Sequence, residues 1–352
     1  MADYAKSLTL NCPAPLPAGE RVLLGHGSGG KLSADLIAKV FVQAFHNPVL
    51  DRLDDQAIVS VNGTRLAFTT DSFVVKPLFF PGGDIGSLAV HGTVNDLAMG
   101  GARPLFLSTA FIIEEGLPLE TLRRVVVSLQ AAAAAAGIEI VTGDTKVVEQ
   151  GSGDELFINT TGIGLVPQDL RLSADQARLG DKILLSGPIG DHGIAILAQR
   201  AGLEFESTIV SDSASLYPLV KVMLDTGAAI RCMRDPTRGG VSSALNEIAA
   251  QSNVGMALDE QQIPIHEEVK GACEMLGLDP LYVANEGKMI AIVEGKHADR
   301  LLSAMRSHVL GRDARIIGTV TDQHPRTVVM RTAFGTTRIV DMLSGDQLPR
   351  IC

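Results

Sequence analysis

Segments that alternate between strand-like and helix-like patterns constrain the fold of this chain most strongly. Short apolar runs such as "RLAFTT" (65–70), "PLFLSTAFII" (104–113) and "IEIVT" (138–142) are typical of strands. The stretch 118–137 between the last two is rich in alanine, with Pro118 at its start and Gly137 after its last turn, which predicts a helix. Strands that alternate with helices in this way predict an α/β (α+β) protein.

A polar stretch, "PQDLRLSADQARLGD" (167–181), interrupts this pattern, which restarts at "KILLSG". The chain has 352 residues, enough for about two domains. We therefore expect an extension over 1–20, a first domain over 21–166 and a second over 167–325. Short strand-like pieces follow in a C-terminal segment, 326–352.

Composition excludes several classes of function. The net charge of −10 gives no basic surface for nucleic acid. No apolar run approaches the roughly 18–20 residues that span a bilayer, and the N-terminus has no apolar core of a secretion signal. We expect a cytoplasmic protein.

The four cysteines form no Cys-x-x-Cys pair, so the sequence predicts neither a zinc site nor a thioredoxin-like motif. Cys232 and Cys273 lie in apolar segments, where free cysteine usually packs as a small hydrophobe. Cys352 is the last residue, in the ending "LPRIC". From the tail alone, this position is either accidental or chemical.

The glycine-rich stretch "VLLGHGSGGKLS" (22–33) resembles a P-loop, but Leu32 stands where a P-loop needs Ser or Thr for Mg²⁺. Two other interpretations stay open. The stretch could contact phosphate through Gly27, Gly29, Gly30 and Lys31, since the amides at a helix start favour anions. It could also be a plain flexible loop.

Acidic residues stand at or near the ends of the predicted elements. Singly, each is most often a solvated loop end or a helix cap. Together they offer the oxygen ligands that suit Mg²⁺ with phosphate, and the scattered histidines suggest no softer metal. The residues are Asp54, Asp55, Asp71, Asp96, Asp144, Asp235 and Glu286. They favour a Mg²⁺–nucleotide enzyme without a P-loop.

An ordered series of motifs resembles the HypE family of hydrogenase maturation proteins over nearly the whole chain. The motifs are "HGSGGK", "DDQA", "TTDSFVV", "PLFFPGGDIGSLAVHGTVNDLAMGGARP", "EEGLP", "VTGDTKVV", "GDHG", "RDPTRGG", "ANEGK" and the terminal "PRIC". The wider group is similar to aminoimidazole ribonucleotide synthetase, selenophosphate synthetase and thiamine monophosphate kinase. This resemblance implies an N-terminal mixed-sheet domain that binds ATP and forms a homodimer, a C-terminal α/β sandwich and a flexible tail.

The resemblance also implies roles for residues. Mg²⁺ and ATP would be held by Asp55, Asp71, Asp96 and Asp144, with Asn95 and Asp54 beside them. Asp235 and Arg238 would order the phosphate side of the site. Lys146 and Glu286 would handle the substrate's protons or orient its carbamoyl group. The alternative for Lys146 is an ordinary surface lysine.

The same resemblance implies a reaction. A HypF-type carbamoyltransferase would place a carbamoyl group on the sulfur of Cys352, and ATP would drive its dehydration to a thiocyanate. The cyanide would pass to iron on a HypC–HypD complex. Two alternatives remain: another enzyme of the superfamily, such as a small-molecule kinase, or a nucleotide-binding scaffold without turnover.

Overall fold

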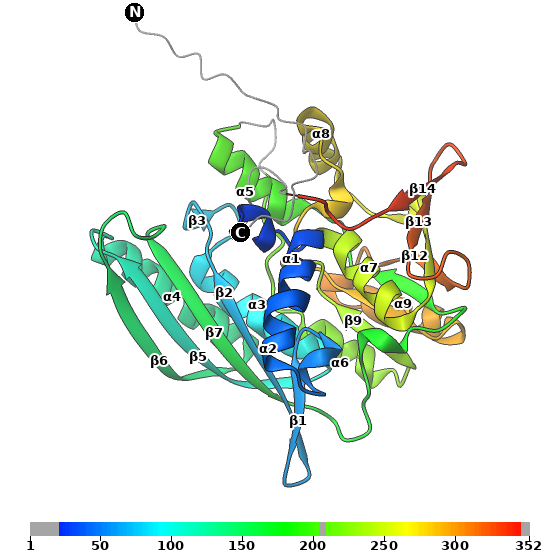
Figure 1. Ribbon diagram of the computed structural model, residues 1–352, viewed down its shortest axis with the longest axis horizontal. Coiled ribbons are helices and arrows are strands. Elements are labelled where there is room, and N and C mark those ends of the chain that lie inside the picture. The colour runs from blue at the N-terminus through cyan, green and yellow to red at the C-terminus, as the bar shows by residue number, and fades with distance from the viewer. Residues whose placement is uncertain (1–20, 204–208, 346–352) are drawn as a thin grey trace, which may run out of the picture.

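Two β-sheets, one in each half of the chain, organise the structure (Figure 1). The computed structural model describes residues 21–203 and 209–345. The five-stranded sheet of the first half has the order β1-β2-β7-β5-β6. Its strands are β1 (Ala57–Val61), β2 (Thr64–Phe73), β5 (Arg103–Glu114), β6 (Glu139–Val148) and β7 (Leu156–Leu165). A two-stranded ribbon of β3 (Phe79–Phe80) and β4 (Gly83–Asp84) lies between β2 and the first long helix.

All pairs in this sheet are antiparallel except β5 and β6, which are parallel. Helix α4 (Leu119–Ala136) connects these two strands, as parallel neighbours require a crossover. It begins after Pro118 and ends at Gly137, which adopts the left-handed conformation with φ +69°. The predicted helix over 118–137 is therefore confirmed.

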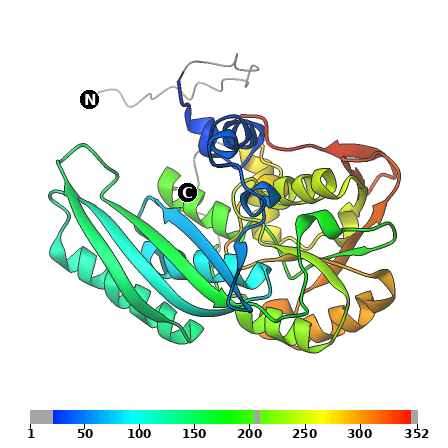
Figure 2. The ribbon, with the colours of Figure 1, turned by 60° about the horizontal axis from the view of Figure 1, so that its bottom comes forward.

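Helix α3 (Ile85–Met99) is the most deeply buried helix of the first half. It starts at Asp84, whose carboxylate accepts hydrogen bonds from the N–H groups of Gly86 and Ser87. The helix carries apolar residues on all of its faces and packs against β2, β7 and α4. Helices α3 and α4 cover one face of the sheet, and no helix of the described residues covers the other, the bare face (Figure 2). Consequently, polar residues late in α3 lie deep in the molecule.

The sheet of the second half has seven strands in the order β14-β13-β10-β12-β8-β11-β9. They are β8 (Lys182–Leu185), β9 (Ile230–Arg234), β10 (Gly255–Asp259), β11 (Ile290–Val293), β12 (Arg315–Thr321), β13 (Val328–Arg331) and β14 (Thr337–Val340). The helices are α5 (Asp191–Ala201), α6 (Tyr217–Asp225), α7 (Gly240–Ser252), α8 (Glu267–Leu276) and α9 (Ala298–Arg306). Every residue of β11 is buried, so this strand lies in the core.

The predicted domain limit at residue 325 falls between β12 and β13, which belong to the same sheet. Two strand predictions were wrong in extent. β2 runs past Asp71 to Phe73, and β6 includes Asp144 instead of ending before it. Both acids therefore lie within strands, where their direction is fixed by the alternation of side chains between the two faces.

A helical segment precedes the first sheet, formed by α1 (Lys31–Leu36), a π-helical stretch (Ile37–Val42) and α2 (Gln43–Phe45). Figure 1 shows it in front of the region between the two sheets. The N–H of Lys31 donates to the carbonyl of Leu343, so this segment also contacts the end of the described chain. Within residues 21–203 and 209–345, none of the helices combines the length and apolarity that a membrane crossing needs.

Candidate functional site

A cavity of about 240 Å³ opens beside the glycine-rich segment, between the two halves of the chain. Gly27, Gly29 and Ser33 line one side. The opposite side is formed by the loop 235–240 and the first turn of α7. A helix N-terminus with glycines around it presents free N–H groups, which favour phosphate. The cavity therefore suits an anionic ligand.

A second, smaller cavity of about 50 Å³ lies behind the same loop. Asp71 from β2, Asp96 from α3 and Glu286 from the loop before β11 line it. Asp235, Thr237 and Arg238 line both cavities, so the two form adjoining parts of one site. Four buried or partly buried carboxyl groups thus face a small space beside a pocket suited to an anion.

The glycine-rich segment lies so close to the loop that a side chain would not fit. Gly29 has φ +73°, and a Cβ atom there would lie 2.4 Å from the carbonyl oxygen of Arg238. Only glycine satisfies both the conformation and the approach. The segment thus forms one wall of the larger cavity.

Asp55 connects the halves at the back of the larger cavity. Its Oδ1 pairs with Nη1 of Arg234, at the end of β9, while its buried Oδ2 has no hydrogen-bond partner. Burial raises the pKa of the Asp55 carboxyl, and the neighbouring Arg234 guanidinium opposes that rise. One oxygen is therefore fixed and the other is free to bind a ligand.

Asp96 and Asp235 share the same buried environment. The Thr69 hydroxyl donates to Oδ2 of Asp96 at 2.8 Å and fixes this carboxyl. Burial, followed by repulsion from Asp235, Asp55 and Asp71, raises the pKa of Asp96 well above its ordinary value. Burial and Asp55 do the same to the pKa of Asp235. A cation would relieve this concentration of negative charge.

Glu286 is the carboxyl group most isolated from solvent on the far side of the small cavity. It is 7% exposed, and burial, with repulsion from Asp235 and Asp71, raises its pKa well above the ordinary value. Arg238 acts in the opposite direction. A buried carboxyl with a raised pKa is a common feature of sites that transfer protons.

Mg²⁺ fits these residues when a phosphate completes its coordination. No group of three or more His, Cys, Asp or Glu side chains within the described parts of the chain is arranged to hold a metal. Mg²⁺, however, usually takes one or two carboxylates with substrate phosphates and waters. The unpartnered Oδ2 of Asp55 and the crowded carboxyl of Asp96 match that requirement.

Two predicted residues, Asp144 and Lys146, lie outside this site within one chain. In the sheet register Asp144 is opposite Ala110, which is opposite Asn159, which is opposite Ser72. Paired residues share a face, and Ser72 points away from its neighbour Asp71. Asp144 and Lys146 are therefore on the bare face, 3.7 Å apart and exposed.

Other predicted residues have structural partners. Asn95 donates through Nδ2 to the carbonyls of Ala214 and Glu286, and its Oδ1 accepts the N–H of Leu216. These bonds use both N–H donors of the Asn95 amide and one of the two acceptor positions of its oxygen. The direct cofactor contact expected for Asn95 stays a prediction. Asp54 likewise accepts bonds from Ser173 and Ala174.

Neither Gly30 nor Lys31 lines the cavities. Lys31 Nζ binds Oδ2 of Asp341 at 2.5 Å, and a Cβ on Gly30 would collide with the carbonyl of Leu343. The chain end therefore packs against the glycine-rich segment through residues 341–343. Cys352 lies outside the described residues.

Several residues that line the larger cavity are missing from the sequence-based prediction, among them Arg234, Ser243 and Glu247. Ser243, in the first turn of α7, has a buried hydroxyl without a hydrogen-bond partner. Glu247 lies one turn further, 3.5 Å from Arg234. The four-residue spacing of Ser243 and Glu247 in "RGGVSSALNE" fits one face of a helix that starts at the glycines, and this signal could have identified these two residues.

Comparisons with known proteins agree with this organisation. The family model "AIR synthase related protein, N-terminal domain" matches residues 53–166, and "AIR synthase related protein, C-terminal domain" matches 178–331. The chain is 60% identical over 327 residues to "Carbamoyl dehydratase HypE" of Azotobacter vinelandii, covering 93% of this chain and 96% of that protein.

Solved structures of relatives give the same result. A structure described as a HypE–HypF complex has a TM-score of 0.84 and 50% identity, covering 88% of this chain and 99% of the other. One described as hydrogenase maturation protein HypE in complex with ATP has a TM-score of 0.79 and 51% identity, covering 94% and 100%. The two-domain fold expected from the sequence is confirmed.

Proposed function

Because this chain belongs to the HypE family of carbamoyl dehydratases, we propose that it uses ATP to dehydrate a carbamoyl group carried on its own Cys352. The product is a thiocyanate, whose cyanide is a ligand for the iron of [NiFe] hydrogenase. One observation carries this proposal: a pocket suited to phosphate adjoins a small acidic cavity that contains Glu286.

The division into two cavities fits the two substrates. ATP occupies the larger cavity, with its phosphates toward the amides of the loop 235–240 and the start of α7. The small cavity takes the carbamoyl group, next to the terminal phosphate. Arg238 lines both and stands where charge develops during phosphoryl transfer.

The reaction follows from the poor leaving ability of an amide oxygen. The carbamoyl oxygen attacks the γ-phosphorus, the bond to the β-phosphate oxygen breaks, and ADP leaves. The nitrogen then loses its two protons. The C–O bond breaks, phosphate leaves, and the C≡N bond forms. ATP and the thiocarbamate thus give thiocyanate, ADP, phosphate and a proton.

Residues of this chain position these groups. Glu286 accepts a nitrogen proton, since its raised pKa makes its carboxylate a stronger base than an exposed glutamate. Asp55 and Asp96, with Asp71 and Asp235 nearby, hold Mg²⁺. When bound, the metal neutralises charge on the phosphates.

Asp144 and Lys146 complete the site from a second protomer in a homodimer. The bare face of the five-stranded sheet supports this part of the proposal. Phe68, Ile163 and Phe106 are opposite one another in the register and 36–46% exposed. An exposed apolar stripe across three strands is typical of a protein interface. Lys146 lies on the same face and would reach the partner's cavity.

The position of the chain end supports delivery of Cys352 to the site. Leu343 contacts Gly30 and Lys31 beside the larger cavity. Nine residues follow Leu343, and an extended chain of that length spans about 30 Å. That reach is enough to enter the site and to present the thiol to another enzyme. A HypF-type carbamoyltransferase loads the thiol, and a HypC–HypD complex receives the cyanide.

Intact mass spectrometry tests the proposal. The chain is incubated with a HypF-type carbamoyltransferase and its substrates, before and after addition of MgATP, beside a Cys352→Ala variant. We expect gain of one carbamoyl group and then loss of one water, both absent in the variant. ATP hydrolysis without any adduct would favour a kinase of the superfamily, and an adduct that never loses water would favour a scaffold.

A further inference from the structure

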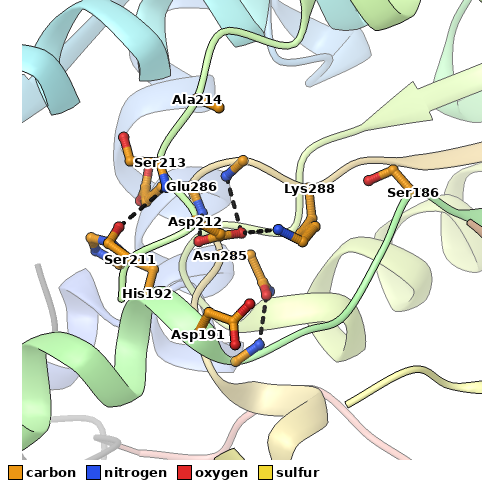
Figure 3. A network of polar contacts seen from close by, with 12 residues as sticks. Ser186, Asp191, His192, Ser211, Asp212, Ser213, Ala214, Asn285, Glu286 and Lys288 are labelled. Atoms are coloured by element: carbon orange, nitrogen blue, oxygen red, sulfur yellow. Dashed lines mark hydrogen bonds and ion pairs between the residues drawn. The ribbon is translucent and has the colours of Figure 1, made fainter. Parts of the chain in front are cut away.

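The buried carboxylate of Asp212 accepts hydrogen bonds from the backbone at Glu286. Oδ1 of Asp212 accepts the N–H of Glu286 at 3.1 Å, and Oδ2 accepts the N–H of Gly287 at 3.2 Å. Oδ2 also lies 3.0 Å from Nζ of Lys288. Figure 3 shows Asp212 between Glu286 and Lys288, with contacts on both sides. Three successive residues are thus bound by one side chain.

The opposite end of the same residue is held from α3. Nδ2 of Asn95 donates to the carbonyl oxygen of Glu286 at 3.2 Å, and Asn95 precedes Asp96 in the sequence. The N–H of Ala214, from the segment that carries Asp212, reaches this carbonyl at 3.4 Å. The backbone of Glu286 is therefore fixed at both its donor and its acceptor.

The segment that carries Asp212 is itself anchored to the first half of the chain. The N–H of Ser211 donates to the carbonyl of Pro81 at 2.8 Å. The Ser213 hydroxyl lies 2.9 Å from Nδ1 of His91 on α3. Burial lowers the pKa of His91 to about 4, which keeps this ring neutral. The contacts of this segment therefore fix the position of Glu286 relative to α3, the helix that carries Asp96.

Close packing holds Asp212 and residues 286–288 in place. The Asp212 side chain is 3% exposed, and that of Lys288 is 12% exposed. A Cβ atom on Gly287 would lie 1.8 Å from the carbonyl oxygen of Asp212. The two backbones are in direct contact, so a change in one displaces the other.

We propose that Asp212 is a positioning residue that fixes Glu286 for removal of the carbamoyl nitrogen proton. This inference rests on the proposed function, because it assigns Asp212 a part in the same proton transfer. Asp212 lines neither cavity, so it is not among the residues expected to contact the substrate. It acts by holding the Glu286 backbone where the side chain meets the substrate.

The test uses Asp212→Asn in the full chain, loaded by the carbamoyltransferase. The substitution keeps the size of the side chain but turns one acceptor into a donor that faces the N–H of Gly287 and the Lys288 ammonium. Loss of water is followed by intact mass in a single turnover at increasing MgATP. We expect the maximal rate to fall about 100-fold, as for small displacements of catalytic groups, with an unchanged half-saturating ATP concentration.

Asp181→Asn is the matched control. Asp181 is also 3% exposed at its side chain, accepts the N–H of Arg178 at 2.8 Å and lies 3.6 Å from Arg231, but it lines neither cavity. We expect this variant to lose thermal stability and to keep its maximal rate. If both variants slowed equally, Asp212 would act through general stability and the inference would be wrong.

Two further variants separate the effect of the Asp212–backbone hydrogen bonds from that of the Asp212–Lys288 ion pair. Lys288→Met removes the cation and leaves both carboxylate oxygens of Asp212 to accept the N–H groups of Glu286 and Gly287, so its rate should stay close to that of the wild type. Gly287→Ala keeps both charges but forces the two backbones apart, and should be as slow as Asp212→Asn. The reverse pattern would overturn the inference. A wild-type chain that never loses water would instead overturn the proposed function, and the inference with it.

Discussion

The guanidinium of Arg234, at the end of β9, binds the carboxylate of Asp55, which precedes β1 in the other half of the chain. Nη2 of Arg234 also donates to the carbonyl of Leu53 at 2.7 Å. One side chain of the second half therefore holds the backbone and the carboxylate of a loop from the first half. This contact closes the larger cavity and orients the free oxygen of Asp55.

Loss of this arginine should destabilise the protein strongly. Arg234→Met leaves the Asp55 carboxylate, whose side chain is 12% exposed, without its charge partner. We expect the free energy of unfolding in urea to fall by about 3–5 kcal/mol. Arg331→Met, which breaks an exposed pair with Asp259, should change it by less than about 1 kcal/mol. Equal effects would contradict the account.

Replacing an acid of the buried cluster should stabilise the protein, and the size of the gain should depend on pH. Burial and repulsion from Asp235 raise the pKa of Asp96 in the folded protein. A raised folded-state pKa gives stability at low pH that is lost as the pH rises through that pKa. Without Mg²⁺, Asp96→Asn should therefore melt above the wild type at about pH 8, with the difference shrinking toward about pH 5. A difference that is constant with pH would be inconsistent with this explanation.

Two adjacent serines in α7 offer a test of the larger cavity. Ser243 lines it with an unpartnered hydroxyl, whereas the Ser242 hydroxyl donates to the carbonyl of Asp341 at 2.6 Å. Ser243→Ala should weaken ATP binding about fivefold, which is about 1 kcal/mol, and leave stability unchanged. Ser242→Ala should lower stability and leave ATP binding unchanged. Calorimetric titration with ATP and thermal melting distinguish the two outcomes.

Mixed dimers test whether Lys146 acts on the partner's site. We expect Lys146→Ala and Glu286→Gln each to abolish dehydration, because each removes a group from every site of a homodimer. In a mixed dimer one site would combine an intact Glu286 with an intact Lys146 of the partner subunit. Mixing the two variants should restore loss of water. Mixed dimers that form, as shown by two affinity tags, yet stay inactive would refute action across the interface.

The sequence predicted β2, β5 and β6 because short apolar runs there are punctuated by glycine, proline and acids, but it did not predict β1, β3 or β4. Gly137 and Pro118 limit α4 as expected from their backbone preferences. Strand ends were less predictable. Asp71 and Asp144 stay in their strands because the neighbouring strands continue the hydrogen-bond ladder past them, which local sequence does not encode.

The site was predicted in composition but not in arrangement. Asp55, Asp71, Asp96, Asp235 and Glu286 stand out as acids near the ends of elements, and the fold brings them to two adjoining cavities. The separation of Asp144 depends on strand register, which fixes the face on which it lies. Asn95 contacts the backbone of Glu286 and Leu216, 191 and 121 residues away, and Asp212 contacts the backbone of Glu286 and Gly287, 74 and 75 residues away. No local pattern reveals such contacts.

The most direct test of the central claim is the fate of the carbamoyl oxygen. The chain is loaded with a carbamoyl group that carries a heavy isotope of oxygen, and the phosphate released after addition of MgATP is examined by mass spectrometry. Phosphorylation of that oxygen predicts that the label leaves in inorganic phosphate, with thiocyanate on Cys352. Unlabelled phosphate accompanied by thiocyanate formation would contradict the account, because the oxygen would then have left without activation by ATP.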